Sequence, residues 1–285
     1  MTTTTTTVAC WACGAAAAPD PAWLPIELHR CPSCGLLFAP DRTAEDLQRL
    51  YDAGYFAEYP GGEGYEEDPA QRRYEADRRI EWIRGYRTGG RLLEIGAAAG
   101  HFVEAAAEAG FEPTGVEPAE DLARRATERL GLPVLAGFIE EVDLPEGSFD
   151  VACAWHVVEH LSDPRPALER VARFLRPGGH FFVEVPNIAS VYAQRRGKGW
   201  ANLDIRHHVG HYTPMALQAL LERSGFTVVA TETFPMRGYL RPGRALKPRE
   251  VAAAAKEAAL VRAHPLRAHP WRHEMLRAVA VTRAA

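Results

Sequence analysis

Apolar and polar residues alternate in two distinct ways between residue 87 and the C-terminus. Short apolar runs have the length of buried strands, and between them apolar residues recur every three or four positions, as on one face of a helix. Strands and helices that alternate along a chain are typical of a parallel sheet with crossover helices. The pattern therefore predicts an α/β domain whose seven strands lie at 91–95, 111–116, 133–135, 149–154, 180–185, 226–234 and 275–282.

The helices of this domain are bounded by residues that favour helix ends. The segment 177–179, Pro-Gly-Gly, ends one helix. Thr213 and Pro214 suit the N-cap and the first position of another. The predicted helices lie at 101–109, 119–130, 166–175 and 214–224.

Residues 1–86 lack this alternation. Thr43 and Asp46 predict a capping box that opens a short helix, the glycine-rich stretch 51–64 predicts a loop, and an arginine-rich helix is predicted at about 69–82. We therefore divide the chain into three parts. These are residues 1–40 with a disordered tail at 1–8, a helical linker at 41–86, and an α/β domain at 87–285 with a basic surface insertion at about 236–272.

Composition and charge exclude several classes of protein. The net charge of −4 provides no basic field for nucleic acid, and no apolar run approaches the ~20 residues that span a bilayer. The N-terminus lacks the basic start and apolar core of a signal peptide. We therefore expect a cytoplasmic protein that contacts no membrane, and the charge disfavours a nucleic-acid partner. In that compartment paired cysteines indicate metal or redox chemistry.

Four of the five cysteines form two pairs with the spacing of a zinc ribbon. Two residues separate the cysteines of each pair, and a glycine follows each pair, which suits a tight turn that directs both sulfurs at one ion. Four thiolates leave no position for water, so the metal should be structural. Redox disulfides, an iron–sulfur cluster and unliganded core cysteines are the alternatives. The expected ligands are Cys10, Cys13, Cys31 and Cys34, and Cys153 is expected to be a core residue.

A turn of small residues follows the first predicted strand, in the sequence LLEIGAAAG at 92–100. Such a turn lets a ligand approach the backbone at a helix N-terminus, although alanine-rich turns are also common without any ligand. Glu117 ends the second strand, where a carboxylate can accept hydrogen bonds from both hydroxyls of a ribose. Glu94, inside the first strand, suits a ligand that carries an ammonium group and no phosphate.

The motifs LLEIGAAAG, GVEP, SFD at 148–150 and FLRPGGHFFVEVPN resemble those of class I S-adenosylmethionine-dependent methyltransferases. The resemblance covers about residues 85–235 and implies a Rossmann-like, seven-stranded methyltransferase sheet with helices on both faces. It implies that Glu94, Gly96 and Gly100 border the methionine part of the cofactor and that Glu117 holds the ribose. The residues implied at the adenine are Pro118, Phe138 and Ile139.

The sequences CPSCGLLFAP and LQRLYDAGYF are similar to the zinc-ribbon start of a methyltransferase subgroup from natural-product and surface-sugar pathways. That likeness implies that the linker 41–86 caps the cofactor, with Tyr55 and the arginine-rich helix over the pocket. From its position alone, Tyr55 is a loop aromatic.

Histidines follow the fourth predicted strand, at the strand end where open α/β sheets bind ligands. His160 is the leading candidate for a general base, with a structural hydrogen bond as its alternative role, and His156 is expected to line the cofactor. The methyltransferase resemblance matches His208, in a loop rich in histidine, to a residue that closes over the acceptor. A metal site among these histidines is the weaker alternative, because no orienting carboxylate has a clear spacing.

These observations predict an enzyme that methylates a small molecule, with a hydroxyl of a secondary metabolite or sugar preferred as acceptor. Methylation of carbon or nitrogen, an RNA methyltransferase and a non-catalytic binding module are the alternatives. Base-amine methylation is disfavoured because Trp155-His156-Val157-Val158 stands where such enzymes carry an Asn/Asp-Pro-Pro-aromatic motif. The expected cofactors are S-adenosylmethionine and a structural zinc ion, the expected partner is the acceptor, and a homodimer is left open.

Overall fold

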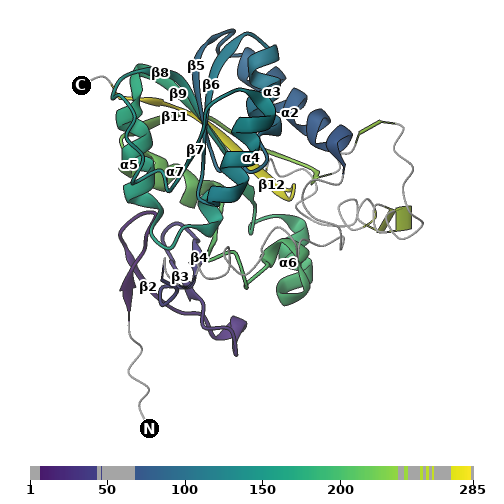
Figure 1. Cartoon of the computed structure of the whole chain (residues 1–285). Coiled ribbons are helices and arrows are strands. Elements are labelled where there is room, and N and C mark those ends of the chain that lie inside the picture. The colour runs from purple at the N-terminus through teal and green to yellow at the C-terminus, as the bar shows by residue number, and fades with distance from the viewer. Residues whose placement is uncertain are drawn as a thin grey trace.

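A mixed seven-stranded sheet forms the centre of the molecule (Figure 1). The computed structural model describes residues 7–43, 46, 68–236, 241–242, 251–252, 255–256, 259 and 271–283. Within them the strand order is β11-β12-β9-β8-β5-β6-β7, parallel except for β12, which is antiparallel to both of its neighbours. The strands are β5 (Gly90–Ile95), β6 (Phe111–Glu117), β7 (Val134–Ala136), β8 (Phe149–Trp155), β9 (Leu175–Pro186), β11 (Phe226–Phe234) and β12 (Met275–Thr282).

The predicted Rossmann-like sheet of seven strands is confirmed, and β9 shows the largest difference in bounds. It begins at Leu175, five residues before the predicted start at 180, directly after α5 (Pro164–Phe174). Phe149 of β8 pairs with Leu175, and Val151 pairs with His180, so four residues of β9 stand opposite one residue of β8. The segment 177–179, which the sequence predicts as a break, is accommodated as an irregularity inside the strand.

Helices cover both faces of the sheet (Figure 1). On one face lie α5 and α7 (Pro214–Arg223), and on the other lie α2 (Pro69–Arg84) and α3 (His101–Glu108). α4 (Glu120–Leu130) packs against β6 and β7. Alternation along the central strand β5 explains this division, because Leu92 packs with α2 and α3 whereas Leu93 and Ile95 belong to the core beneath α5 and α7.

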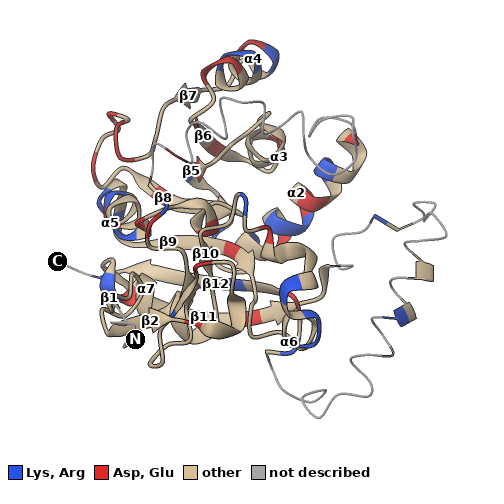
Figure 2. Ribbon diagram, turned by 90° about the horizontal axis from the view of Figure 1, so that it is seen from below, with Lys and Arg blue, Asp and Glu red and all other residues tan. Residues whose placement is uncertain are grey.

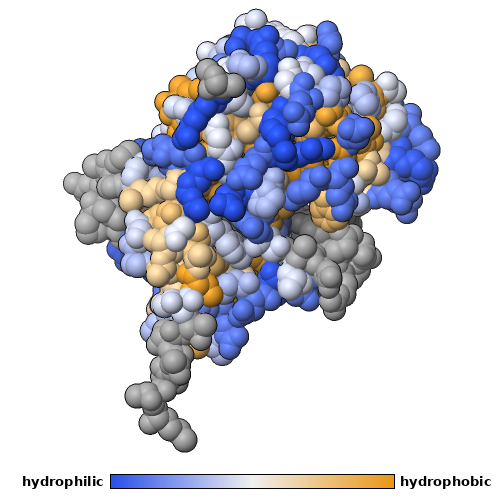
Figure 3. Space-filling view, turned by 90° about the vertical axis from the view of Figure 1, so that its left-hand side faces the viewer, coloured by the Kyte–Doolittle hydropathy of each residue, from blue (hydrophilic) through white to orange (hydrophobic). Residues whose placement is uncertain are grey.

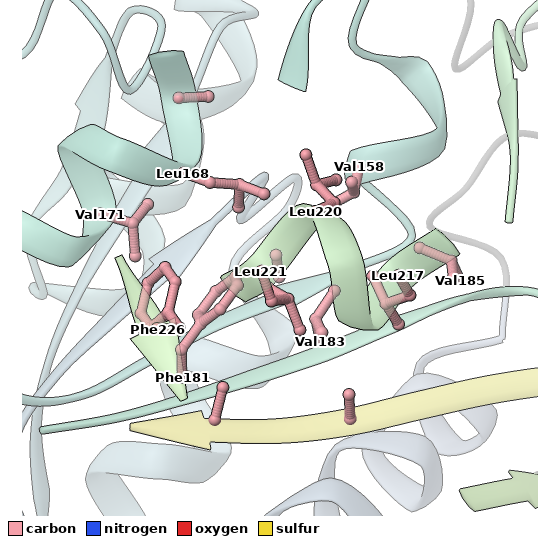
Figure 4. Close-up of a cluster of buried hydrophobic side chains, with 14 of the residues drawn as sticks. Val158, Leu168, Val171, Phe181, Val183, Val185, Leu217, Leu220, Leu221 and Phe226 are labelled. Carbon is pink, nitrogen blue, oxygen red and sulfur yellow. The ribbon is translucent and has the colours of Figure 1, made fainter. Parts of the chain in front are cut away.

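The core beneath α5 and α7 is continuous from helix to sheet (Figure 4). Leu220 and Leu221 of α7 belong to this core together with Phe181 and Val183 of β9, and each of these side chains is fully buried. The hydroxyl oxygen of Thr213 accepts a 3.0 Å hydrogen bond from the Ala216 amide, so the predicted N-cap of α7 is confirmed.

Leu220→Ala should lower the free energy of unfolding by about 2–5 kcal/mol, because it removes a fully buried side chain and leaves a cavity. Urea denaturation followed by circular dichroism measures the change. Met215→Ala, on the same helix and 52% exposed, is the control and should change the unfolding free energy by less than about 0.5 kcal/mol. Equal losses in the two variants would contradict the packing of α7.

The N-terminal segment forms a small sheet that the α/β domain completes. Its strands are β1 (Val8–Ala9), β2 (Ala16–Pro19), β3 (His29–Arg30) and β4 (Leu37–Phe38), followed in space by β10 (Gly210–His211). β10 pairs antiparallel with β4 and comes from the loop before α7. Leu36 and Phe38 share one hydrophobic core with Leu217 and Leu220 of α7. This N-terminal segment (residues 8–38), which we call the ribbon, is therefore packed onto the α/β domain.

Shorter elements follow the central strands. They are the 3₁₀ turns η1 (Pro21–Trp23), η2 (Val158–His160), η3 (Gly197–Gly199) and η4 (Ala201–Leu203), and the helix α6 (Val191–Arg196). The predicted capping box is present, since Thr43 Oγ1 accepts from the Asp46 amide and Asp46 Oδ2 accepts from the Thr43 amide, both at 3.1 Å. The predicted loop at 51–64, most of the tail at 1–8 and most of the insertion at 236–272 lie outside the described residues.

Charges of both signs are interleaved on the outer helices (Figure 2). Ion pairs one helical turn apart join Arg73 to Asp77 on α2 and Arg124 to Glu128 on α4. The face shown in Figure 3 is covered mainly by hydrophilic side chains, with apolar areas between them. Among the described residues, no helix is both long and apolar enough to cross a membrane.

Candidate active site

The turn between β5 and α3 lies at the carboxyl ends of the parallel strands. Gly96, Ala98 and Gly100 have φ angles of 73°, 46° and 79°, the left-handed region that favours glycine. A Cβ atom at Gly96 would lie 2.5 Å from a Val157 methyl group, so this turn packs directly against the segment that follows β8. The structure therefore brings the glycine turn and the histidine segment together.

Glu117 ends the neighbouring strand and binds the same turn. Its carboxylate accepts hydrogen bonds from the Ala98 amide at 2.8 Å and from the Ala119 amide at 3.0 Å. The residue is 4% exposed, and burial raises the pKa of the carboxyl group although both amide bonds lower it. A carboxylate held in this way has a fixed orientation at the end of β6.

Glu94 lies inside β5, one strand away from Glu117. It is buried, and its Oε2 has no hydrogen-bond partner among the described residues. Burial raises the pKa of Glu94 well above its usual range, against the opposing charge of Arg79 and with a further increase from Glu117. A buried carboxylate oxygen without a partner is costly, and an ammonium group of a ligand would satisfy it.

The residues expected around an adenine ring follow β6 and β7. The Gly137 amide donates to the Glu117 carbonyl at 3.0 Å, which places these two strand ends side by side. Pro118 and Phe138 are half-buried, and Ile139 is buried in the core beneath α5. Tyr55, expected over the same pocket, lies outside the described residues.

His156 and Glu159 form a pair at the end of β8. His156 has a left-handed φ of 58°, and its Nδ1 lies 3.0 Å from Glu159 Oε1. Glu159 is only 1% exposed, and its Oε2 has no hydrogen-bond partner among the described residues. Burial raises the pKa of Glu159, but the hydrogen bond and charge of His156 outweigh it and, with His160 and His208, hold the pKa at about 2.

His160 and His208 meet although 47 residues separate them in sequence, with ring centroids 4.7 Å apart in an edge-to-face arrangement. Nδ1 of His160 donates to the His207 carbonyl at 3.2 Å, and Nδ1 of His208 donates to the Asn202 carbonyl at 3.0 Å. Because a carbonyl oxygen only accepts, each neutral ring carries its proton on Nδ1 and keeps Nε2 as an acceptor.

Burial favours the neutral form of two imidazoles in this region, those of His160 and His211. It lowers the pKa of His160 to about 3, with a further decrease from the charge of His208. The pKa of the buried His211 is lowered to about 3 by the same two causes. At neutral pH both imidazoles therefore offer a lone pair and carry no charge.

The ribbon holds the loop that carries His208. Ala39 donates its amide to the Val209 carbonyl at 2.9 Å, and β4 then pairs with β10 over the next residues. Thr213 donates its hydroxyl to the Cys34 carbonyl at 2.6 Å. The Val209 amide binds the Glu159 carbonyl at 2.8 Å, so the loop is fixed between the ribbon and the segment after β8.

The four predicted cysteine ligands are brought together by two similar turns. The glycine after each pair donates its amide hydrogen to the carbonyl oxygen of the first cysteine in that pair. The φ angle is 78° at both Gly14 and Gly35. The Sγ atoms of Cys10 and Cys34 are 3.6 Å apart, and those of Cys13 and Cys31 are 3.4 Å apart. Zinc–sulfur bonds of about 2.3 Å in a tetrahedron require about 3.8 Å between sulfurs, so this donor set fits zinc closely. Cys153 is fully buried in the core, as predicted.

Two residues of the site have no role in the sequence analysis. Glu159 is one, although a charged residue directly after the apolar pair Val157-Val158 could have indicated a buried polar role. His211 is the other, and its signal was its place in the histidine-rich loop; its ring centroid lies 6.3 Å from that of His208.

The comparisons with known proteins fit this geometry. A family described as "Methyltransferase domain" matches residues 70–231, more than half of the chain. The chain belongs to this family. The matched segment of this methyltransferase domain contains both buried carboxylates and the histidine cluster, and the four cysteines precede it.

Two relatives of this methyltransferase domain differ in the acceptor atom that their names give, oxygen in one and carbon in the other. A ubiquinone biosynthesis O-methyltransferase from Bordetella avium is 32% identical over 118 residues, which are 38% of this chain and 49% of the relative. The C-methyltransferase NovU from Streptomyces niveus is 28% identical over 158 residues, 54% of this chain and 37% of the relative. The chain thus spans about half or less of the length of these relatives.

A solved structure supports the fold of the domain. The 1,6-didemethyltoxoflavin-N1-methyltransferase of Burkholderia thailandensis, with 1,6-didemethyltoxoflavin and S-adenosylhomocysteine bound, has a TM-score of 0.57 at 18% identity. The match covers 93% of this chain and 99% of that one.

Proposed function

We propose that the chain transfers a methyl group from S-adenosylmethionine to a small-molecule acceptor, with an oxygen atom favoured over carbon or nitrogen. The acceptor class is a secondary metabolite or sugar, as the motif resemblance implies. The observation that carries the proposal is the pair of buried carboxylates, Glu94 and Glu117, at adjacent strand ends beside the glycine turn.

Each carboxylate suits one part of the cofactor. The unpartnered Oε2 of Glu94 is a site for the cofactor's ammonium group, and Glu117 is placed to accept bonds from the ribose hydroxyls. Gly96 and Gly100 let the methionine part lie close to the backbone, His156 lines the transfer site, and Pro118, Phe138 and Ile139 flank the adenine. Once bound, the sulfonium supplies an activated methyl group.

The chain's remaining contribution is to the acceptor. His160 and His208 stand beside the transfer site with Nε2 as an acceptor nitrogen, so they are placed to draw the acceptor's proton away as its oxygen attacks. The acceptor oxygen gains the methyl group, the carbon–sulfur bond breaks, and S-adenosylhomocysteine leaves. An oxygen acceptor is favoured because an O–H group needs this removal of a proton.

The cysteine cluster has a separate role in the proposal. We assign to Cys10, Cys13, Cys31 and Cys34 a structural zinc ion, since four buried or half-buried sulfurs leave no position for a reacting group. The ion would stabilise the ribbon that holds the His208 loop.

Glu117→Ala should weaken S-adenosylhomocysteine binding by about 100-fold. The substitution removes the two proposed hydrogen bonds from the ribose hydroxyls to the carboxylate, each worth about 1.5 kcal/mol or more. Isothermal titration calorimetry on zinc-loaded protein measures the affinity. Glu112→Ala, an exposed residue at the other end of β6, should bind as the wild type does. Absence of binding to folded wild-type protein would refute the proposed function and favour a non-catalytic binding module.

A further inference from the structure

The segment after β8 and the loop before β10 place three metal-ligating side chains in one cluster. One ligand atom each from Glu159, His160 and His208 lies within 4.8 Å of the others. Bonds of about 2.1 Å to one ion require ligand atoms about 3.0–3.5 Å apart. Side-chain rotations that move the ligand atoms by about 1–2 Å would therefore bring all three within bonding distance of one ion. The cluster is separate from the four cysteines.

The hydrogen bonds around the cluster fix tautomers of the two histidines that suit a metal ligand. Nδ1 of His160 and Nδ1 of His208 each donate to a backbone carbonyl, which leaves Nε2 as the acceptor nitrogen of both rings. Metal-bound histidines almost always have this arrangement, because the bond at the other nitrogen fixes the tautomer and the ring orientation.

The carboxylate provides an independent indication. His156 holds Oε1 of Glu159, and Oε2 of the same buried group has no hydrogen-bond partner among the described residues. The cost of such an orphaned oxygen is removed when it binds a cation. His156 then has the role of orienting the ligand carboxylate.

We propose that Glu159, His160 and His208 bind a divalent transition-metal cation, which would coordinate an acceptor that carries two neighbouring oxygen atoms. Two imidazoles and one carboxylate suit Mn²⁺, Fe²⁺ or Zn²⁺ better than Mg²⁺ or Ca²⁺, which prefer oxygen ligands. Three protein ligands leave open positions on a roughly octahedral ion, enough for a bidentate acceptor.

This inference deepens the proposed function and rests on it for the identity of the acceptor site. With the cation present, His160 and His208 act as its ligands in place of accepting the acceptor's proton themselves, and the cation lowers the pKa of the acceptor hydroxyl. The acceptor proton then leaves to solvent before or as the methyl group is transferred. Val157 contacts the glycine turn, and two of the ligands, Glu159 and His160, follow Val157 closely in the sequence. The cation would therefore lie next to the expected cofactor site.

The test is titration of zinc-loaded protein, holding one zinc per chain, with Mn²⁺. The electron paramagnetic resonance signal of free Mn²⁺ falls as the ion binds, and Mn²⁺ does not displace zinc from thiolates. We expect one Mn²⁺ per wild-type chain, with affinity reduced about 10–100-fold in both Glu159→Gln and His208→Ala. His180→Ala, at the amino-terminal edge of the same sheet, is the control and should bind Mn²⁺ as the wild type does.

Absence of Mn²⁺ binding, or binding that persists in both variants, overturns the metal site. Calorimetry with S-adenosylhomocysteine on the same samples keeps the two proposals distinct, because cofactor binding without Mn²⁺ binding refutes only the metal site. Circular dichroism confirms that each variant is folded.

A second measurement tests the acceptor class. Catechol, with neighbouring oxygens, should change the spectrum of protein-bound Mn²⁺, and phenol should not. No change with catechol, or the same change with both, overturns bidentate coordination of the acceptor.

Discussion

Replacing His160 with alanine should lower the rate of methyl transfer by about 100-fold or more while S-adenosylhomocysteine affinity stays within about twofold of wild type. The proposed function places this side chain beside the transfer site, where it acts on the acceptor. Glu94 and Glu117, the proposed cofactor ligands, lie on β5 and β6 and are unaffected. An effect on turnover without an effect on cofactor binding would therefore assign the histidine to the reaction.

Transfer of radiolabelled methyl groups to a panel of catechols, phenols and hydroxylated sugars measures the rate, and calorimetry measures cofactor affinity. His208→Ala should cause a similar loss, and the double variant should lose little more than either single variant, because the two residues act as one unit. His180→Ala removes a half-buried histidine that stacks on Phe182 and should leave the rate unchanged. Wild-type turnover in both His160→Ala and His208→Ala would remove the cluster from the reaction.

The central sheet could be predicted from the sequence because its signals are local. Most of β8 is a short apolar run, and Thr213 caps α7 through a bond within its own turn. The start of β9 could not be predicted, because Pro177, Gly178 and Gly179 favour a break by themselves and only the pairing with β8 continues the strand across them.

The candidate site was predictable in its residue types and not in its assembly. His160 and His208 were identified as site residues, but their contact depends on a loop that the ribbon and η2 hold from two sides. From the sequence a metal site is the weaker alternative, because no carboxylate has a clear spacing to the histidines. Glu159 is that carboxylate, and its burial and its unpartnered oxygen exist only in the folded chain.

The packing of the ribbon onto the α/β domain could not be predicted from the sequence either. β10 comprises only Gly210 and His211, too short for any periodic pattern, and its partner β4 lies more than 170 residues away in the chain. This pairing gives the cysteine cluster a link to the histidines that spacing alone did not suggest.

Removal of the proposed zinc ion should therefore lower turnover strongly even though the ion lies outside the reaction. Structural zinc sites contribute about 10–16 kcal/mol in small peptides, comparable to the whole stability of a domain at about 5–15 kcal/mol. Loss of the ion, in Cys31→Ser or after chelation, should unfold the ribbon and release β10 from β4. His208 would then lose the support of Val209 and Thr213, which bind Ala39 and Cys34.

Hydrogen exchange measured by mass spectrometry distinguishes this indirect effect from a catalytic one. In Cys31→Ser, amide protection should fall about 100-fold in the loop around His208, with little change in β5 and α3, and S-adenosylhomocysteine should still bind. Cys153→Ala, which changes a buried cysteine outside the cluster, should keep its zinc and the protection of the loop. Loss of turnover with the loop still fully protected would mean that the cysteine cluster acts on the reaction by another route, because the β4–β10 pairing would then be intact in an inactive protein.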